Sequence, residues 1–350
     1  MSLMRGLADD LPLMEWLQKY IWPTESANVS PQFVYDGTRL ACAEMLRGGI
    51  TCFNDMYFFP DAAATAAAEF GMRAMLGITT LEFPTPYASD ADDYIDKGLA
   101  IRDRWLDHPL IGFCLAPHAP YTVSDDSFAR ILTLSEQLTL PIHCHIHETW
   151  HEVEESRRQH GAAPLARLKR LGLLGPGFIG VHAIHLDDDD LDLLAVAGCS
   201  IAHCPTSNLK LASGIAPVAR MRQLGINVGL GTDGAASNNR LDMFSEMRLA
   251  ALLAKGSTGD ASTLPARTAL RMATLDGATA LGLADEIGSI TPGKAADLVA
   301  VSLNGLNTKP CYDPVSHLVH AADRDCVTHV WVAGKCCVDH KTLAANGQND

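Results

Sequence analysis

One short stretch, PIHCHIHETW at residues 141–150, places three histidines at alternate positions and follows them with an acid. Because side chains alternate between the two faces of a β-strand, His143, His145 and His147 are expected to share one face. A histidine at the end of such a strand can present a ring nitrogen to a metal ion, and Glu148 could then reach a metal-bound water. A hydrogen-bonded core histidine beside a surface acid is the plain alternative.

Polar residues also end several other strand-like runs, among them Asn54-Asp55, His185 and His203. His182 can be a core histidine or a substrate contact, and we favour the contact. Asp233 lies between glycines in VGLGTDGAASNN, where an acid could close a strand or cap a helix. His118 begins the proline-stiffened turn HAP, and we expect a role in the site for it as well.

The elements that must position these residues alternate between strand-like and helical patterns. Amphipathic segments such as 127–138 and 216–225 separate short apolar runs, which predicts a parallel sheet with crossover helices. A barrel gathers its strand ends around one mouth, whereas an open sheet spreads them, so the convergence of polar ends favours a (β/α)₈ barrel. Seven strands are expected, at 50–55, 73–80, 110–117, 140–147, 178–185, 199–205 and 227–233.

The pattern changes near residue 286, so we expect a barrel over 1–286 and a smaller unit over 287–345. Segments 288–302 and 326–340 look like short strands around glycine turns, with a helical turn at 317–323 between them. This second unit is expected to be a small all-β appendage.

Composition excludes several classes of protein. The chain of 350 residues has a net charge of −14, so a nucleic-acid or anionic-membrane partner is not expected. No apolar run reaches transmembrane length, and no secretory signal pattern opens the sequence. The ten cysteines form no C-x-x-C pair, which indicates reduced thiols and a cytoplasmic location.

Several motifs together resemble the amidohydrolase superfamily, and PGKAADLVAV (292–301) looks like its C-terminal signature. The opening stretch LMRGLADDLPLMEWL (3–17) is similar to the branch of 5'-methylthioadenosine/S-adenosylhomocysteine deaminases. The other motifs are HIHET (145–149), VHAIHL (181–186), HCPTSNLKLASGIAPV (203–218) and LGTDGAASNN (230–239).

The resemblance implies a metal-bearing barrel, with one Zn²⁺ per subunit in the complete enzyme, and a small β-sandwich of which residues 287–345 would be the C-terminal part. His145 and Asp233 would be metal ligands, and Glu148 would shuttle a proton from the attacking water to the purine ring. His182 would polarise the attacked ring and, with Asp233, would stabilise and reprotonate the intermediate. The reaction implied is hydrolytic deamination of an adenosine-type nucleoside to the inosine analogue and ammonia.

The same resemblance assigns the substrate contacts. Glu25, in IWPTE, would bind the ribose hydroxyls, and His118 would contact the nucleoside. The loop 81–97 holds five acids and one lysine but no arginine, so the amino-acid tail of S-adenosylhomocysteine lacks a cationic partner there. Its residues Phe83 and Tyr87 suit an uncharged thioether. We therefore expect 5'-methylthioadenosine or adenosine to be preferred.

One departure from the family pattern is serious. Members carry an H-x-H pair on the first barrel strand, just before the stretch matched by residues 3–17, and this chain has no H-x-H there. We therefore expect a barrel without its first strand, weak or absent zinc, and unpaired strand edges that could support a homo-oligomer. The alternatives are another ring hydrolase, such as a triazine chlorohydrolase, and a catalytically inactive nucleoside-binding barrel.

Overall fold

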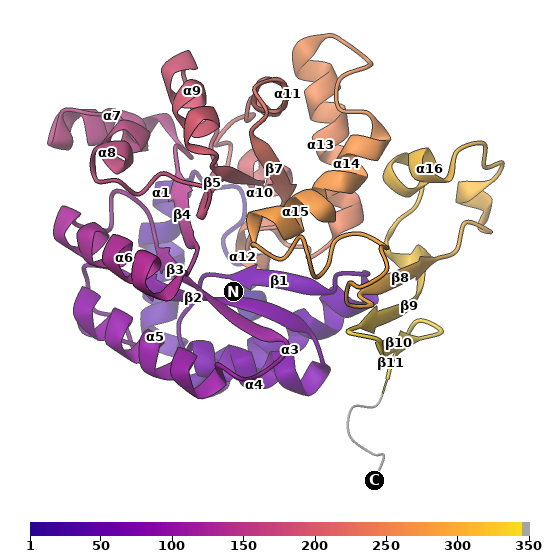
Figure 1. Cartoon of the computed structure of the whole chain (residues 1–350), viewed down its shortest axis with the longest axis horizontal. Helices are drawn as coiled ribbons and strands as arrows, with labels where there is room; N and C mark the ends of the chain where they lie inside the picture. The colour runs from indigo at the N-terminus through magenta and orange to yellow at the C-terminus, as the bar shows by residue number, and fades with distance from the viewer. Residues whose placement is uncertain (345–350) are drawn as a thin grey trace.

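A seven-stranded parallel sheet forms the centre of the chain (Figure 1). The computed structural model describes residues 1–344, and every strand of this sheet pairs with its neighbours in chain order. All seven strand-like runs are thereby confirmed as strands. They are β1 (Cys52–Asp55), β2 (Arg73–Thr80), β3 (Ile111–Pro117), β4 (Ile142–Ile146), β5 (Phe178–His182), β6 (Ser200–His203) and β7 (Asn227–Leu230).

Helices connect the strands and cover the sheet (Figure 1). Local side-chain chemistry determines where the helices begin. Asp187, for example, caps its helix through reciprocal hydrogen bonds with Asp190, and acidic residues are favourable at the positive end of the helix dipole. The helices are α1 (Leu13–Trp16), α2 (Trp22–Asn28), α3 (Pro31–Arg47), α4 (Pro60–Phe70), α5 (Ala91–Trp105), α6 (Asp125–Leu138), α7 (Trp150–His160), α8 (Pro164–Arg170), α9 (Asp188–Ala197), α10 (Pro205–Lys210), α11 (Val218–Gln223), α12 (Ala235–Asn238), α13 (Met243–Thr258), α14 (Ala266–Met272), α15 (Leu275–Ala280) and α16 (Pro314–His320), with a π-helical segment at Leu17–Ile21.

The sheet is open between β1 and β7. Within residues 1–344, β1 pairs only with β2 and β7 only with β6, so an eight-stranded closed barrel is not formed by them. Helix α15 packs directly on β7, where a Cβ on Gly229 would lie only 2.9 Å from Cα of Gly277. The fold is therefore α/β with a curled seven-stranded parallel sheet, which agrees with the expected barrel family in its main features.

The C-terminal part forms a second sheet. Its order is β11-β10-β9-β8, and its strands are antiparallel. These described residues make one sheet; the second sheet that a sandwich requires is not among them. The strands are β8 (Leu298–Val301), β9 (Val327–Val332), β10 (Lys335–Asp339) and β11 (Thr342–Leu343), and α16 lies between β8 and β9 as expected.

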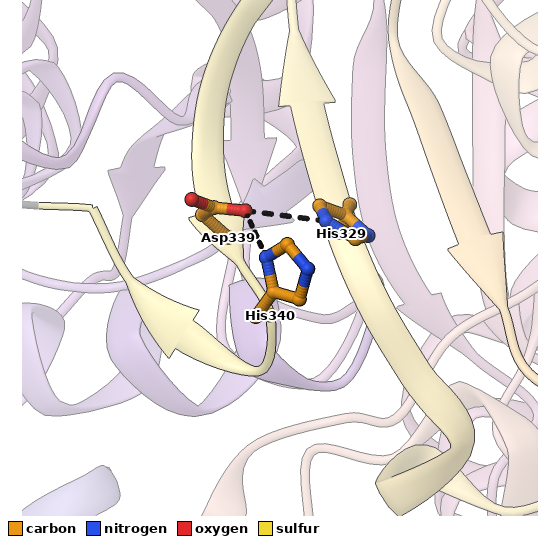
Figure 2. Close-up of side chains that lie close together, drawn as sticks. All are labelled: His329, Asp339 and His340. Atoms are coloured by element: carbon orange, nitrogen blue, oxygen red, sulfur yellow. Dashed lines mark hydrogen bonds and ion pairs between the residues drawn. The ribbon is translucent and has the colours of Figure 1, made fainter.

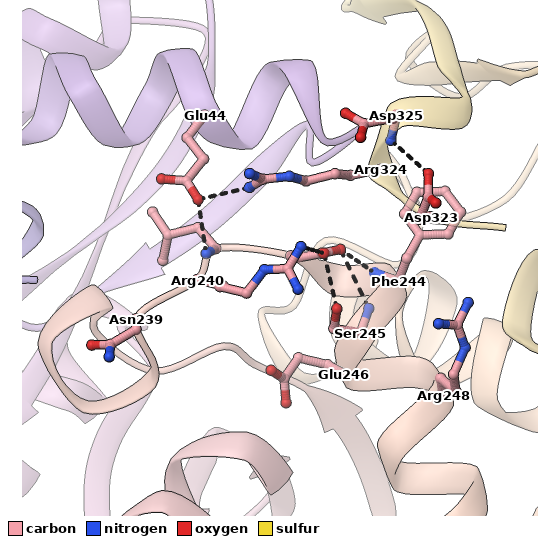
Figure 3. A network of polar contacts seen from close by, with 12 residues as sticks. Glu44, Asn239, Arg240, Phe244, Ser245, Glu246, Arg248, Asp323, Arg324 and Asp325 are labelled. Carbon is pink, nitrogen blue, oxygen red and sulfur yellow. Dashed lines mark hydrogen bonds and ion pairs between the residues drawn. The ribbon is translucent and has the colours of Figure 1, made fainter. Parts of the chain in front are cut away.

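Charged side chains link the C-terminal part to the helices around the main sheet (Figure 3). Arg324, just before β9, donates to Glu44 of α3 at 2.9 Å, and Arg248 of α13 donates to the carbonyl of Val319 at 3.2 Å. Deeper in the protein, Arg73 at the start of β2 donates to Asp297 at 3.2 and 3.3 Å, and both side chains are buried. The C-terminal part is thus anchored to the main sheet through salt bridges and backbone contacts.

None of the helices within residues 1–344 is both long and apolar enough to span a membrane.

Candidate active site

A cavity of about 830 Å³ opens at the carboxyl ends of the parallel strands. The residues predicted for the site come from α2 and from the ends of β3, β4, β5 and β7. All six line this one cavity, and their roles stay predictions. They are Glu25, His118, His145, Glu148, His182 and Asp233.

Backbone strain marks two of these strand ends. His182 and Ala183 have φ angles of 70° and 48°, and Asp233 has a φ of 61°, all in the left-handed region that non-glycine residues avoid. Surrounding contacts hold the strained conformation; for instance the Ala183 amide donates to the Ile146 carbonyl at 3.0 Å. Such strain persists only where the structure over-determines it, and it is concentrated at functional sites.

Hydrogen bonds fix the orientation of His145 and His118. Nδ1 of His145 donates to the His118 carbonyl at 2.7 Å, which leaves Nε2 without a proton in the neutral ring. Nδ1 of His118 lies 2.9 Å from the Thr122 hydroxyl, which itself donates to the Ala119 carbonyl, so the hydroxyl accepts from the ring. Burial lowers the pKa of both histidines, that of His118 to about 3, so both rings are neutral.

His182 is oriented in the same way and faces Glu148. Its Nδ1 donates to Oδ1 of Asn208 at 2.8 Å, and its Nε2 lies 3.7 Å from Oε2 of Glu148. Both side chains are buried, and desolvation lowers the pKa of His182. The ring therefore offers an unprotonated Nε2 beside the carboxyl group of Glu148.

Glu148 is poised to exchange a proton near neutral pH. Burial raises the pKa of its carboxyl group to about 7, with the neighbouring Asp233 charge raising it further and His145 opposing the rise. A general acid–base group works best when its pKa is close to the working pH. The Glu148 amide donates to Oε2 of Glu152 at 2.8 Å, so this second buried acid fixes the backbone that presents Glu148.

Asp233 is held by a ring of donors. Its Oδ2 accepts from the hydroxyls of Ser207 at 2.6 Å and Ser237 at 2.7 Å, and its Oδ1 accepts from the amide of Gly234 at 2.6 Å. Burial raises the pKa of Asp233, but His182 and these donors outweigh burial and lower it overall. The Asp233 carboxylate is therefore ionised, which is the form that binds a metal ion or accepts a proton during catalysis.

Glu25 also lines the cavity and pairs with Tyr57, a residue that no sequence motif singles out. The hydroxyl of Tyr57, just after β1, donates to Oε1 of Glu25 at 2.8 Å. Burial raises the pKa of Glu25, and the Tyr57 bond opposes this rise. The pair presents a fixed acceptor that could receive hydroxyl groups.

His147 does not share the face of its two neighbours. β4 ends at Ile146, and a φ of 50° turns His147 away, so its Nδ1 bonds the His185 carbonyl and its Nε2 accepts from the Leu165 amide. The expectation of three histidines on one strand face is wrong for this residue. His143 does line the cavity, with its ring centroid 6.2 Å from that of His145 and a buried Nδ1 without a partner.

Other sequence expectations meet mixed outcomes. His203 ends β6 but does not line the cavity, whereas Ser207 and Asn208 support Asp233 and His182. Phe83 packs on Trp22 and Tyr87 on Phe59, and neither loop aromatic is part of the cavity wall. Apolar residues from many parts of the chain line the cavity, and those of the N-terminal segment are Leu13, Trp16, Leu17 and Ile21.

The cavity offers zinc ligands of the right kind but in small number. Nε2 of His145 and the carboxylate of Asp233 are suitable zinc donors, and a catalytic zinc site usually has three protein ligands and an open position. Across residues 1–344, the only three potential ligand atoms within 4.8 Å of one another are elsewhere, at His329, Asp339 and His340. The nearest further imidazoles are those of His118 and His182, whose ring centroids lie 5.0 and 5.4 Å from that of His145.

Two supporting residues could have been found from the sequence, and one could not. Thr149 and Glu152 form the T-x-x-E pattern of a helix start, and Thr149 indeed caps α7 by accepting from the Glu152 amide. No spacing rule connects Tyr57 to Glu25, because their contact depends on how folding brings α2 next to the loop after β1.

The strained strand ends, the cavity at the carboxyl edge of a parallel sheet and the His/Asp/Glu set define an amidohydrolase-type site. The amidohydrolase family pattern matches residues 1–337, and the chain belongs to this family. Its relatives are named deaminases, which makes the chain a hydrolase of the kind that acts on C–N bonds in cyclic amidines.

Particular relatives narrow the comparison. A 5-methylthioadenosine/S-adenosylhomocysteine deaminase of Saccharophagus degradans is 52% identical over 98% of this chain and 77% of its own length. The crystal structure of an adenosine deaminase from Xanthomonas campestris with bound zinc has a TM-score of 0.96 and 52% identity, covering 98% of this chain and 78% of that one. An atrazine chlorohydrolase from Arthrobacter aurescens, complexed with zinc, has a TM-score of 0.92 but 24% identity, covering 98% and 82% of the two chains, and so shares the fold alone.

Proposed function

We propose that this chain has the site of a metal-dependent nucleoside deaminase, which hydrolyses adenosine-type nucleosides to the inosine analogue and ammonia. The observation that carries the proposal is the Glu148–His182 pair, a buried acid with a pKa near 7 at 3.7 Å from an unprotonated imidazole nitrogen. Deamination needs such a pair, because protons must leave the attacking water and reach the ring and the departing ammonia.

His145 and Asp233 are the residues that would hold zinc. What zinc supplies in such a site is acidification of water, which gives a nucleophile near neutral pH. These two groups, one imidazole Nε2 and one ionised carboxylate, are of the type that zinc binds. They are fewer than the three protein ligands of a usual catalytic zinc site. We therefore infer that the chain as given binds zinc weakly in the cavity.

The chain's own residues would then move the protons. Glu148, as its carboxylate, accepts a proton from the attacking water and delivers it to a purine ring nitrogen. His182 accepts a proton through Nε2, because Asn208 holds the proton on Nδ1. His182 and Asp233 would take up the second proton of the added water as the C6–O bond becomes a carbonyl, and would return it to the amino group, which leaves as ammonia.

The rest of the cavity would select the nucleoside. The Glu25–Tyr57 pair is placed to accept the ribose hydroxyls, and His118 presents its free Nε2 to the nucleoside. No lysine or arginine of residues 1–344 is among the residues that line the cavity. An amino-acid tail would therefore leave its carboxylate without a lysine or arginine partner, which favours 5'-methylthioadenosine or adenosine over S-adenosylhomocysteine.

Of the alternatives, the triazine hydrolase is not favoured, since that likeness extends to the fold alone. A nucleoside-binding barrel without turnover is a second candidate for the chain as given, because only two ligands in the cavity can be named with their supporting contacts.

Ammonia release separates these functions when two forms are assayed. One is the chain as given, and the other, which we call the extended form, is the same chain preceded by a strand that carries H-x-H. Deamination of 5'-methylthioadenosine by the extended form with zinc supports the proposal. Nucleoside binding without ammonia release in both forms would instead identify the silent barrel, and atrazine turnover without nucleoside turnover would identify the ring hydrolase.

A further inference from the structure

A second group of possible metal ligands lies on the C-terminal sheet, outside the cavity (Figure 2). Asp339 ends β10, and its Oδ1 lies 2.7 Å from Nδ1 of His340 and 3.2 Å from Nε2 of His329 on the neighbouring strand β9. We propose that His329, Asp339 and His340 bind a divalent first-row transition-metal ion, of the copper, nickel or zinc type. No step of the deamination chemistry uses these residues, so the proposal is independent of the proposed function.

The tautomer of His329 is set for metal binding. Nδ1 of His329 lies 3.0 Å from the hydroxyl of Thr328, and that hydroxyl donates its one proton to the carbonyl of Ala300 at 3.1 Å. The hydroxyl must therefore accept from the ring, so Nδ1 carries the proton and Nε2 has a lone pair. Outer hydrogen bonds of this kind orient metal-binding histidines in general.

The lone pair of Nε2 then faces another acceptor. Nε2 of neutral His329 and Oδ1 of Asp339 are both lone-pair atoms, and a cation between them satisfies both. Two atoms that bind the same zinc at about 2.0–2.2 Å in tetrahedral geometry lie roughly 3.3 Å apart. The observed 3.2 Å already matches this separation.

A tight turn brings in the third side chain. Asp339 and Thr342 pair across the β10–β11 hairpin, and the two residues between them, His340 and Lys341, have φ angles of 46° and 67°. Two left-handed residues define a turn that usually uses Asn or Gly. His340 occupies this position instead, and the turn sets its ring 4.5 Å from the ring of His329.

Trp331 holds the His329 ring and supplies a signal. It lies two residues further along β9, on the same face, and stacks on His329 at 5.5 Å with an interplanar angle of 9°. Packing on one side and the Thr328 bond at the ring edge limit the motion of His329. A paramagnetic ion such as Ni²⁺ or Cu²⁺ bound at His329 would therefore quench the fluorescence of Trp331.

The ligand set indicates the class of ion. Two imidazoles and one carboxylate suit copper, nickel and zinc, whereas calcium and magnesium prefer all-oxygen sites. His340 is largely exposed, with 84% of its side chain accessible, so water can complete the coordination. The order of affinity expected for such a site is copper above nickel and zinc.

The test is titration of untagged, chelator-treated protein with Ni²⁺, followed by calorimetry and by tryptophan fluorescence. We expect His329→Ala to abolish one binding event and its quenching, and Asp339→Asn and His340→Ala to weaken that event. Thr328→Val removes only the outer hydrogen bond and should weaken binding by about 10 to 100-fold. Trp331→Phe should keep the calorimetric event and lose most of the quenching.

Controls separate this site from others. His320→Ala removes an exposed histidine of α16, and His145→Ala removes the candidate ligand in the cavity; both should keep the event, with unchanged circular dichroism in every variant. Binding that is unchanged in His329→Ala would overturn the proposal. Equal loss in His320→Ala would also overturn it, because the binding would then be unspecific.

Discussion

Nε2 of His182 lies 3.7 Å from Oε2 of Glu148, and neither side chain is open to solvent. The distance is too long for a direct hydrogen bond, so the two groups do not share a proton in this arrangement. Asn208 fixes the ring from one side, and Glu152 fixes the backbone of Glu148 from the other. Two polar anchors thus position a pair that the sequence brings together from two strands.

Replacing Glu148 by Gln should abolish most of the proton transfer while leaving the shape of the cavity intact. In the extended form we expect kcat to fall by about 10² to 10⁴-fold with KM little changed, because general acid–base groups typically contribute that much. Ammonia release from 5'-methylthioadenosine measures it. Glu154→Gln, an exposed acid on α7, is the matched control and should keep full activity. Comparable losses in both variants would contradict the assignment.

The same substitution should change how stability depends on pH in the chain as given. Glu148 holds its proton up to pH about 7 in the folded state but only to its ordinary value of 4.5 when unfolded. The folded state therefore binds more protons between these values, and its stability falls as the pH rises through this window. Glu148→Gln removes this loss, so the variant should be more stable than the parent by about 3 kcal/mol at pH 8.

At pH 4 the two proteins should unfold alike, since the carboxyl group is then protonated in both states. Urea unfolding at pH 4 and pH 8 measures the difference. A variant that is less stable than the parent at pH 8 would show that the Glu148 carboxylate is stabilised by its surroundings, against the effect of burial.

Periodicity and strand-end chemistry were enough to predict the seven strands and to select five of the residues that line the cavity, whereas Glu25 was selected through the family resemblance alone. They could not predict contacts made by the three-dimensional path of a loop. Tyr57 reaches Glu25 because folding brings α2 next to the loop after β1, and His147 turns away because its backbone adopts a positive φ. Alternation assigns faces only while the strand continues, and β4 ends one residue before His147.

The composition of the cavity wall predicts the substrate preference of the extended form. Its apolar part, from Trp16, Leu17 and Ile21, suits a methylthio group, and no basic side chain of the described residues lines it. We expect kcat/KM for 5'-methylthioadenosine or adenosine to exceed that for S-adenosylhomocysteine. Steady-state assays of the three nucleosides test this expectation. A clear preference for S-adenosylhomocysteine would mean that its carboxylate finds a cation outside this wall.

Tyr57 should act on binding through Glu25. Tyr57→Phe removes the 2.8 Å hydrogen bond to the Glu25 carboxyl group, and we expect KM for adenosine to rise about tenfold with kcat nearly unchanged. The effect should shrink with 2'-deoxyadenosine, which lacks one of the hydroxyls that Glu25 is proposed to receive. Tyr35→Phe, which removes a hydroxyl bonded to Glu69 on the surface, is the control. An equal rise in KM for both nucleosides would argue against the ribose contact.

The zinc content of the cavity can be measured once the second site is removed. In a His329→Ala background, any zinc retained after dialysis should belong to the cavity. Only His145 and Asp233 can be named there as ligands with their supporting contacts, and loss of even an outer partner typically lowers affinity by about 10 to 100-fold. We therefore expect the chain as given to retain much less than one zinc and to release no ammonia from adenosine.

The extended form should retain about one zinc and show turnover, since it would have a complete ligand set. His145→Ala in the extended form should lose both. Retention of one zinc together with turnover by the chain as given would contradict the expectation and would identify His182 as the residue to test next as a third ligand.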